Sequence, residues 1–109
     1  MRYEDIKGIL DEIGIPYAYH QFREGTGVEP PFICFFYAAN DDVFADNVNY
    51  QGIVNLYIEL YTNEKDFSAE KKIESALKSH GLSYAKEETY VDTEMLYMQV
   101  YSMEFVITS

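Results

Sequence analysis

Cysteine, tryptophan and basic residues are scarce in this sequence. The single cysteine, Cys34, has no second thiol with which to form an intrachain disulfide, and a reducing cytoplasm fits this usage. Only 8 Lys and Arg residues stand against 19 Asp and Glu residues, which gives a formal net charge of -11. Such an acidic surface repels phosphate groups, and direct binding to nucleic acid or to anionic membranes is therefore disfavoured.

Long apolar runs are absent as well. No stretch approaches the length of a membrane-spanning helix, and no basic and then apolar leader opens the chain. The sequence therefore predicts a soluble, unexported protein. Its 109 residues, of which 48% are hydrophobic and 25% are charged, are typical of a single folded domain that covers residues 1–109.

The motifs of familiar catalytic sites are missing. The sequence contains no Ser-centred elbow, no Gly-rich phosphate cradle and no Cys-His pair. The two histidines, His20 and His80, have no Cys or His neighbour at the spacing of zinc ligands. We therefore expect no enzymatic activity, no metal ion and no cofactor.

Two groups of carboxylates come nearest to a chemical site. The first could offer oxygen ligands to a hard cation such as calcium, and consists of Asp41, Asp42 and Asp46. This loop lacks the glycine and the closing glutamate of an EF-hand. The second group could serve general acid-base catalysis, and consists of Glu87, Glu88, Asp92 and Glu94. Nothing predicts the burial that would tune these groups, and we interpret both as solvated surface.

Aromatic residues, by contrast, are abundant, with 11 Tyr and 7 Phe. They matter most in the segment Tyr50 to Thr62, whose side chains alternate with the period of two of a β-strand. One face of this predicted strand is apolar and carries Val54, Leu56, Ile58 and Leu60. The other face carries Asn55, Tyr57, Glu59 and Tyr61. An outward face with tyrosine rings in place of Lys and Thr predicts a surface that contacts another protein.

The remaining periodicities predict two helices and four further strands. The first helix covers Tyr3 to Ile13, and the second begins at Asp66 or Ser68 and ends at Gly81. The other strands are expected at Tyr17–Phe22, Phe32–Tyr37, Ser83–Asp92 and Leu96–Thr108. The continuous apolar run Phe32–Tyr37 predicts a strand covered on both faces. The segment Ala38 to Asn49 is expected to form the long, mobile arm of a hairpin.

The fold class is therefore α+β, in the order α-β-β-β-α-β-β, with two helices packed on one face of an antiparallel sheet. The opposite face then lacks cover from within the chain. In the last strand Leu96, Met98 and Val100 share a face with Ser102, a change that a bulge or a partner would explain. A bare apolar face is a liability unless something docks there, so we expect self-association. The candidate oligomer contacts are Phe44, Tyr57, Glu59, Tyr61, Met98 and Val100.

The whole pattern resembles the small tail-terminator, or tail-completion, proteins of long-tailed bacteriophages and prophages. An opening helix leads into the short strand of IGIPYAYHQF, and the loop of EGTGVEPPFICFFY carries a Pro-Pro step into an apolar strand. The acidic, Asn-rich NDDVFADNVNY precedes the strand VNLYIELYT. The helix FSAEKKIESALKSHG then leads to the closing strand LYMQVYSMEFVI. The resemblance covers nearly the whole chain, and none of its motifs is catalytic.

What the resemblance implies is a structural virion protein. Proteins of this family typically form rings, often hexameric, that cap the tail tube and support head-tail joining. The implied partners are other copies of the chain, the tail tube and the head-tail connector proteins. The implied location is the virion, with assembly in the cytoplasm of the host bacterium. The arm Ala38 to Asn49 would reach a neighbour or the tube, and Tyr57, Glu59 and Tyr61 would lie near a subunit contact.

Two other functions are compatible with the same residues. The acidity is also what a DNA-mimicking inhibitor would need, with carboxylates in place of phosphates. Alternatively, Tyr17, Tyr37 and Tyr101 could line the pocket of a small-ligand-binding α+β domain. The sequence does not separate a tail terminator from a head-completion protein of similar size.

Overall fold

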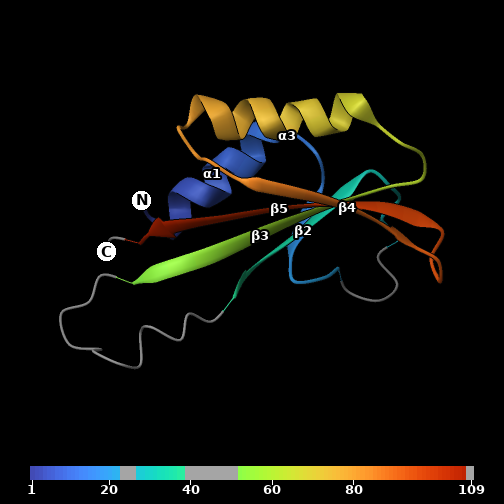
Figure 1. Cartoon of the computed structure of the whole chain (residues 1–109), viewed down its shortest axis with the longest axis horizontal. Coiled ribbons are helices and arrows are strands. Elements are labelled where there is room, and N and C mark those ends of the chain that lie inside the picture. The colour runs from blue at the N-terminus through green and yellow to red at the C-terminus, as the bar shows by residue number, and fades with distance from the viewer. Residues whose placement is uncertain (23–26, 39–51, 108–109) are drawn as a thin grey trace.

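Two helices and five strands make up the described part of the chain, residues 1–22, 27–38 and 52–107, in a computed structural model (Figure 1). In chain order they are α1 (Tyr3–Ile13), β1 (Tyr17–Tyr19), β2 (Phe32–Ala38), β3 (Ile53–Thr62), α3 (Phe67–Ser79), β4 (Ala85–Val91) and β5 (Leu96–Val106). The predicted fold class, α+β in the order α-β-β-β-α-β-β, is confirmed. The predicted arm, residues 38–49, lies outside the described residues except for Ala38 at the end of β2.

The five strands form one sheet in the spatial order β1-β2-β3-β5-β4. The pairs β2–β3, β3–β5 and β4–β5 are antiparallel, as predicted. The short β1 departs from the prediction because it pairs with β2 in parallel, with Tyr17 opposite Ile33. The connection 20–31 is long enough to return the chain to the same end of the sheet, which a tight hairpin cannot do.

Helix α1 follows directly from its sequence. Its apolar stripe, Ile6, Ile9, Leu10 and Ile13, is buried. At its start the backbone N–H of Arg2 donates a hydrogen bond to Asp5 Oδ2 at 2.8 Å. At its end Gly14 adopts a left-handed φ of 80°, which a residue without Cβ reaches at little cost, and donates to the Leu10 carbonyl.

Helix α3 begins at the first of its two predicted caps. Asp66 Oδ1 accepts a hydrogen bond from the backbone N–H of Ala69 at 3.0 Å, which satisfies a donor that the first helical turn leaves unpaired. Its buried apolar residues are Ala69, Ile73, Ala76 and Leu77. The helix ends at Ser79, and Gly81 follows with a left-handed φ of 72°, so the predicted stop is confirmed.

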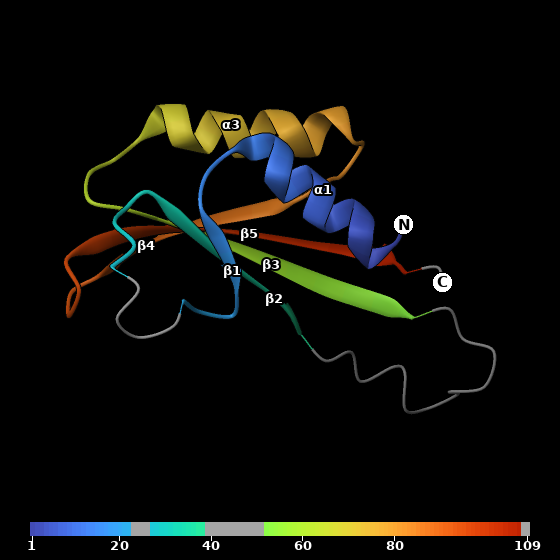
Figure 2. The same ribbon diagram turned by 180° about the vertical axis from the view of Figure 1, so that it is seen from behind.

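Both helices lie on one side of the sheet, as the two opposite views show (Figures 1 and 2). The core fills the space between these layers. From β3 it takes Leu56, Ile58 and Leu60, each no more than 1% exposed, and from β5 it takes Tyr101 and Met103. The predicted alternation of β3 is therefore correct, and it places the core on the helix side.

Among the described residues, no helix lies over the opposite face of the sheet. Strand β2 was expected to be covered on both faces, but only Ile33 and Cys34 are buried, and Phe32 and Phe36 are half-buried. Alternate side chains of this apolar run point toward the helices and toward the side of the sheet that no described helix covers. No bulge interrupts the described pairing of β5, whose register is continuous with both neighbours.

We predict that Asp66→Ala destabilises the protein by about 1 kcal/mol, because the first turn of α3 loses its side-chain acceptor. Asp66→Asn retains an oxygen at the same position and should cost much less. Urea unfolding followed by circular dichroism measures both variants. Equal stabilities of Asp66→Ala and the unchanged protein would show that the cap contributes nothing.

Candidate functional site

The helix-free face of the sheet is the most distinctive surface of the molecule. We call it the open face and define it by Phe32, Cys34, Phe36, Tyr57, Glu59, Tyr61, Glu87, Met98, Val100 and Ser102. Each of these residues points away from the helices because its neighbours along the strand point toward them. The open face thus draws on the four longer strands.

Two stacked aromatic pairs run across the open face. The rings of Phe32 and Tyr61 lie 5.0 Å apart between centroids with an interplanar angle of 22°. The rings of Phe36 and Tyr57 lie 5.1 Å apart at 11°. Within each pair, the two residues lie directly opposite each other in the β2–β3 register. Cross-strand aromatic pairs of this kind stabilise a sheet, and they also present broad apolar rings to whatever lies above them.

The structure brings five of the six predicted contact residues together on this face. In the β3–β5 register Tyr57 lies opposite Ser102, Glu59 opposite Val100, and Tyr61 opposite Met98. All of these side chains are partly exposed. The sixth, Phe44, lies outside the described residues, as do Asp41, Asp42 and Asp46.

A cavity of about 650 Å³ opens on this face. Its walls come from Phe32, Cys34 and Phe36 of β2, Glu59 and Tyr61 of β3, His20 and Phe22 just after β1, and Glu94 of the β4–β5 turn. His20 extends the aromatic layer, since its ring lies 5.8 Å from that of Phe36. It does so in a left-handed conformation, with φ of 69°, which is uncommon for a residue other than glycine.

Besides His20, Gln21 and Glu94, the polar groups that line this cavity are Glu59, Tyr61 and Cys34. The Tyr61 hydroxyl donates a hydrogen bond to Glu59 Oε1 at 3.0 Å, and this fixes the carboxylate among the aromatic rings. Burial, and next the charge of Glu59, raise the pKa of the Tyr61 phenol, which therefore remains a donor at neutral pH. Burial and Glu59 also raise the pKa of the Cys34 thiol to about 11.

This direction of shift opposes nucleophilic chemistry at Cys34. A reactive cysteine has a lowered pKa and sits among positive charges, whereas the charges that act on Cys34 are the carboxylates of Glu59 and Glu94. Among the described residues no group of three or more His, Cys, Asp or Glu side chains could hold a metal ion. The cavity therefore offers shape, aromatic surface and one fixed carboxylate, which are means of recognition.

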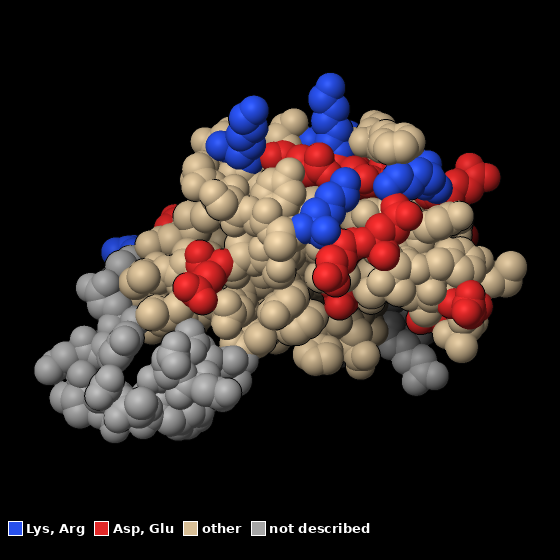
Figure 3. All heavy atoms as spheres, viewed as in Figure 1, with Lys and Arg blue, Asp and Glu red and all other residues tan. Residues whose placement is uncertain are grey.

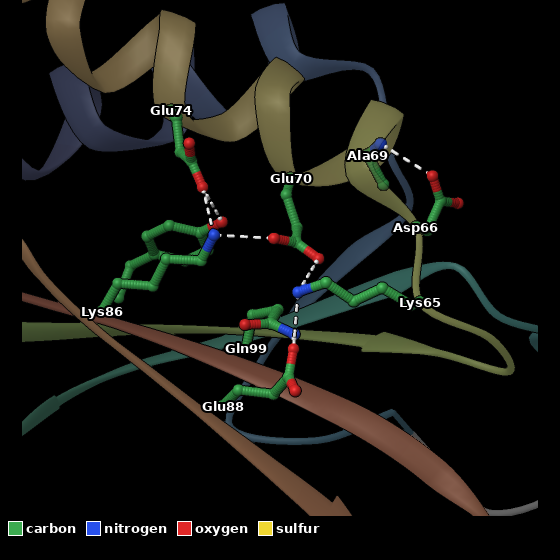
Figure 4. A network of polar contacts seen from close by, with 9 residues as sticks. Lys65, Asp66, Ala69, Glu70, Glu74, Lys86, Glu88 and Gln99 are labelled. Atoms are coloured by element: carbon green, nitrogen blue, oxygen red, sulfur yellow. Dashed lines mark hydrogen bonds and ion pairs between the residues drawn. The ribbon is translucent and has the colours of Figure 1, made fainter.

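A second cluster of ionisable groups joins α3 to β4 and β5 (Figure 4). Its centre is Glu70, which is only 3% exposed. The Glu70 carboxylate accepts from Lys65 Nζ at 2.9 Å and from Lys86 Nζ at 2.6 Å. Lys86 Nζ also donates to Glu74 Oε2 at 2.7 Å, and the Tyr101 hydroxyl donates to the same oxygen.

Every ionised group in this network has a partner within the network. Each carboxylate at its centre has a lysine partner, and Gln99 Nε2 donates to Glu88 Oε1 at 2.6 Å at the outer end. Within the described part of the chain, Gln99 Oε1 is the one buried side-chain atom without a hydrogen-bond partner. We therefore interpret the network as the polar attachment of α3 to the sheet, not as a ligand site.

The sequence did not predict this network. Neither the burial of Glu70 nor the turn of the Glu74 carboxylate toward the sheet was predicted from the sequence. The reason is that Lys86, which contacts both glutamates, comes from β4, a strand that only folding brings close to α3. The one signal available was Gln99, a polar residue at a core position of an otherwise apolar alternation.

The remaining candidates are dispersed. Tyr17, Tyr37 and Tyr101, the residues expected to line a ligand pocket in one alternative, all pack on the helix side of the sheet, against the core or within it. Glu87, Asp92 and Glu94 are exposed, as expected for solvated carboxylates. His80 is the C-cap residue of α3, and its Nε2 lies 3.2 Å from Glu12 Oε2.

The helix layer carries exposed groups of both signs, with Glu4 and Glu12 on α1 and three lysines on α3. Lysine side chains project from the helix layer (Figure 3). Lys71, Lys72 and Lys78 on α3 are exposed and form no ion pair with any other described residue. None of the residues that define the open face is Lys or Arg, and two of them are glutamates.

No protein-family model, curated protein or solved structure matches this chain. Within the described residues, neither helix has the length and apolar character that crossing a membrane would need. The function is therefore inferred from the geometry of the open face and from the distribution of charge.

We predict that Glu74 contributes stability that acid removes. Burial opposes its ionisation, but hydrogen bonds from Lys86 and Tyr101 outweigh burial and hold the pKa of Glu74 below its usual 4.5. Such a group stabilises the fold above the unfolded-state pKa, and the contribution disappears as pH falls through the lower folded-state pKa. Glu74→Gln should therefore cost a few tenths to about 1 kcal/mol at pH 7 and progressively less below pH 4.5.

Urea unfolding at intervals from pH 7 to pH 3 measures this difference. Glu64→Gln, an exposed carboxylate without an ion-pair partner in the described structure, is the matched control and should leave the pH profile unchanged. A stability gap between Glu74→Gln and the unchanged protein that persists at pH 3 would contradict the assignment.

We also predict that Cys34 alkylates slowly at pH 7 and faster with rising pH, with no plateau below pH 10. The reason is that the thiolate is the reactive form and the pKa of Cys34 is about 11. The rate of reaction with iodoacetamide, followed by mass spectrometry, measures this. Glu59→Gln removes a nearby negative charge and should shift the profile to lower pH. A midpoint near pH 8.5, the pKa of an ordinary thiol, would show that Cys34 is not held as described.

Proposed function

We propose that this chain is a structural subunit that assembles with copies of itself through the open face. In this proposal it works as tail-terminator proteins do, forming a ring that caps a phage tail tube and supports head-tail joining. The single observation that carries the proposal is an aromatic sheet face with no helix above it. An antiparallel sheet with one solvated face normally carries polar side chains there.

The composition of the open face supports a contact between proteins. Tyr, Phe and Met are enriched in protein interfaces, and Lys is depleted there. The open face has Phe32, Phe36, Tyr57 and Tyr61 as two stacked pairs, with Met98 beside them and no described Lys or Arg among its defining residues. Rings already held by a stacked neighbour lose little conformational freedom on binding, so their burial yields more net affinity.

The position of the open face supports repeated assembly. Both helices lie on the other side of the sheet, so a partner reaches the open face without displacing any element of the core. Docking therefore requires no unfolding, and the domain is complete before it assembles. A ring subunit needs this property, because each copy folds first and then joins its neighbours.

We expect light scattering during size exclusion to show a species larger than the 12.7 kDa chain, growing with protein concentration. Tyr57→Ser removes a central ring of the open face and should weaken association by about 2 kcal/mol or more, roughly thirtyfold. The matched control is Tyr90→Ser, an exposed tyrosine that packs on Tyr97 away from the open face, and it should associate normally.

Thermal unfolding of both variants checks that each is folded, because Tyr57 also stacks on Phe36. A strict monomer at every concentration would contradict self-assembly through this face. Equal association of the two variants would place the contact elsewhere on the molecule.

A further inference from the structure

We propose that the contact between copies is heterologous: the lysine-bearing surface of α3 in one copy docks on the open face of the next. This inference rests on the proposed function, since it names which surface of the second copy meets the open face. It is carried by a contrast of charge and apolar surface between the open face and the outward surface of α3.

One side of the molecule is acidic and aromatic. The open face carries Glu59 within its cavity and Glu87 at β4, and Glu94 stands at the cavity wall. Glu104 extends the same face of β5, opposite Asn55. No described residue of the open face offsets these carboxylates with a lysine or arginine. The face therefore suits a partner that brings positive charge together with apolar surface.

The other side of the molecule carries both of these. Lys71, Lys72 and Lys78 project from α3 and have no ion-pair partner among the described residues. Phe67, at the start of the helix, is 73% exposed, the largest exposed fraction among the large hydrophobic residues of the described chain. Positions 67, 71 and 78 follow the spacing of one stripe along a helix, so the exposed ring and two of the lysines share a side.

The cavity supplies a seat for one of these cations. A lysine ammonium that enters it meets the Glu59 carboxylate, which Tyr61 holds in place at 3.0 Å. The stem of the same side chain lies against the rings of Phe32 and Phe36, where cation–π attraction adds to apolar contact. The 650 Å³ of the cavity exceeds what one side chain needs, so the seat is reached without rearranging the sheet.

The alternative, a two-fold contact between two open faces, works against the same charges. It would bring the carboxylates of one copy against those of the other, and like charges placed together in an interface cost several kcal/mol. A two-fold contact also stops at a dimer, whereas a heterologous contact continues from copy to copy and closes into a ring when the rotation permits. Charge and the ring proposal therefore favour the same geometry.

Two variants test the inference because each removes one half of the contact. Lys71→Gln/Lys72→Gln/Lys78→Gln neutralises the α3 surface and keeps the open face. Glu59→Gln/Glu87→Gln removes the two carboxylates among the residues that define the open face and keeps the α3 surface. The second variant also lowers the net negative charge, so a loss of association in it cannot come from greater overall repulsion. Light scattering measures each variant alone and then an equimolar mixture of the two.

We expect each variant alone to associate at least tenfold more weakly than the unchanged protein. The mixture should form a 1:1 dimer and no larger species, because only one intact pair of surfaces remains between the two chains. Single Glu59→Gln should weaken association more than single Glu87→Gln, which removes an equal charge outside the cavity. Lys7→Gln, on α1, is the matched control for loss of one lysine and should associate normally.

The outcomes separate this inference from the proposed function. If the α3 variant self-associates as tightly as the unchanged protein, two open faces meet each other, and the heterologous contact is overturned while self-assembly stands. If the two variants fail to combine in the mixture, the heterologous contact is likewise overturned. If the unchanged protein is a monomer throughout, self-assembly fails and this inference fails with it.

Discussion

A single sheet has two faces, and both helices of this chain lie on the same one. The register of β3 between β2 and β5 decides which residues fall on each side. It places Leu56, Ile58 and Leu60 in the core, and a slip by one residue would exchange them for Tyr57, Glu59 and Tyr61. Because the core requires the first set, the second set is presented outward. Hydrophobic burial on one face thus creates the aromatic surface on the other.

The ionic attachment of α3 determines where the remaining charge lies. Burying Glu70 is costly, and only the two lysines that reach it, Lys65 and Lys86, compensate that cost. These two lysines come from a loop and from β4, which leaves the lysines of α3 itself without partners in the described structure. Helix α3 is therefore attached to the sheet by lysines from outside the helix, while the lysines of α3 itself are exposed. The exposed lysines on the outward surface of α3 follow from this arrangement.

How much the sequence could predict depends on whether a feature is local. The bounds of α1, the cap Asp66, the stop at Gly81 and the alternation of β3 each depend on neighbours in the chain, and each is confirmed. The parallel pairing of the three-residue β1 is not local, since periodicity does not encode strand direction. The burial of Glu70 depends on Lys86, and the cavity unites His20, Glu59 and Glu94, so only the folded chain brings these groups together.

Net charge and local charge have opposite effects on the association of such a protein. Copies with a formal charge of -11 repel one another at a distance, and salt screens that repulsion beyond a Debye length of about 8 Å at physiological ionic strength. A lysine seated against Glu59 in a partly dry cavity acts at contact distance, where screening is weak. Moderate salt therefore removes more of the repulsion than of the attraction. In the proposed contact, an acidic chain whose unpaired lysines, among the described residues, lie in the helix layer would in this way remain dispersed as a monomer and still join copies in a fixed orientation.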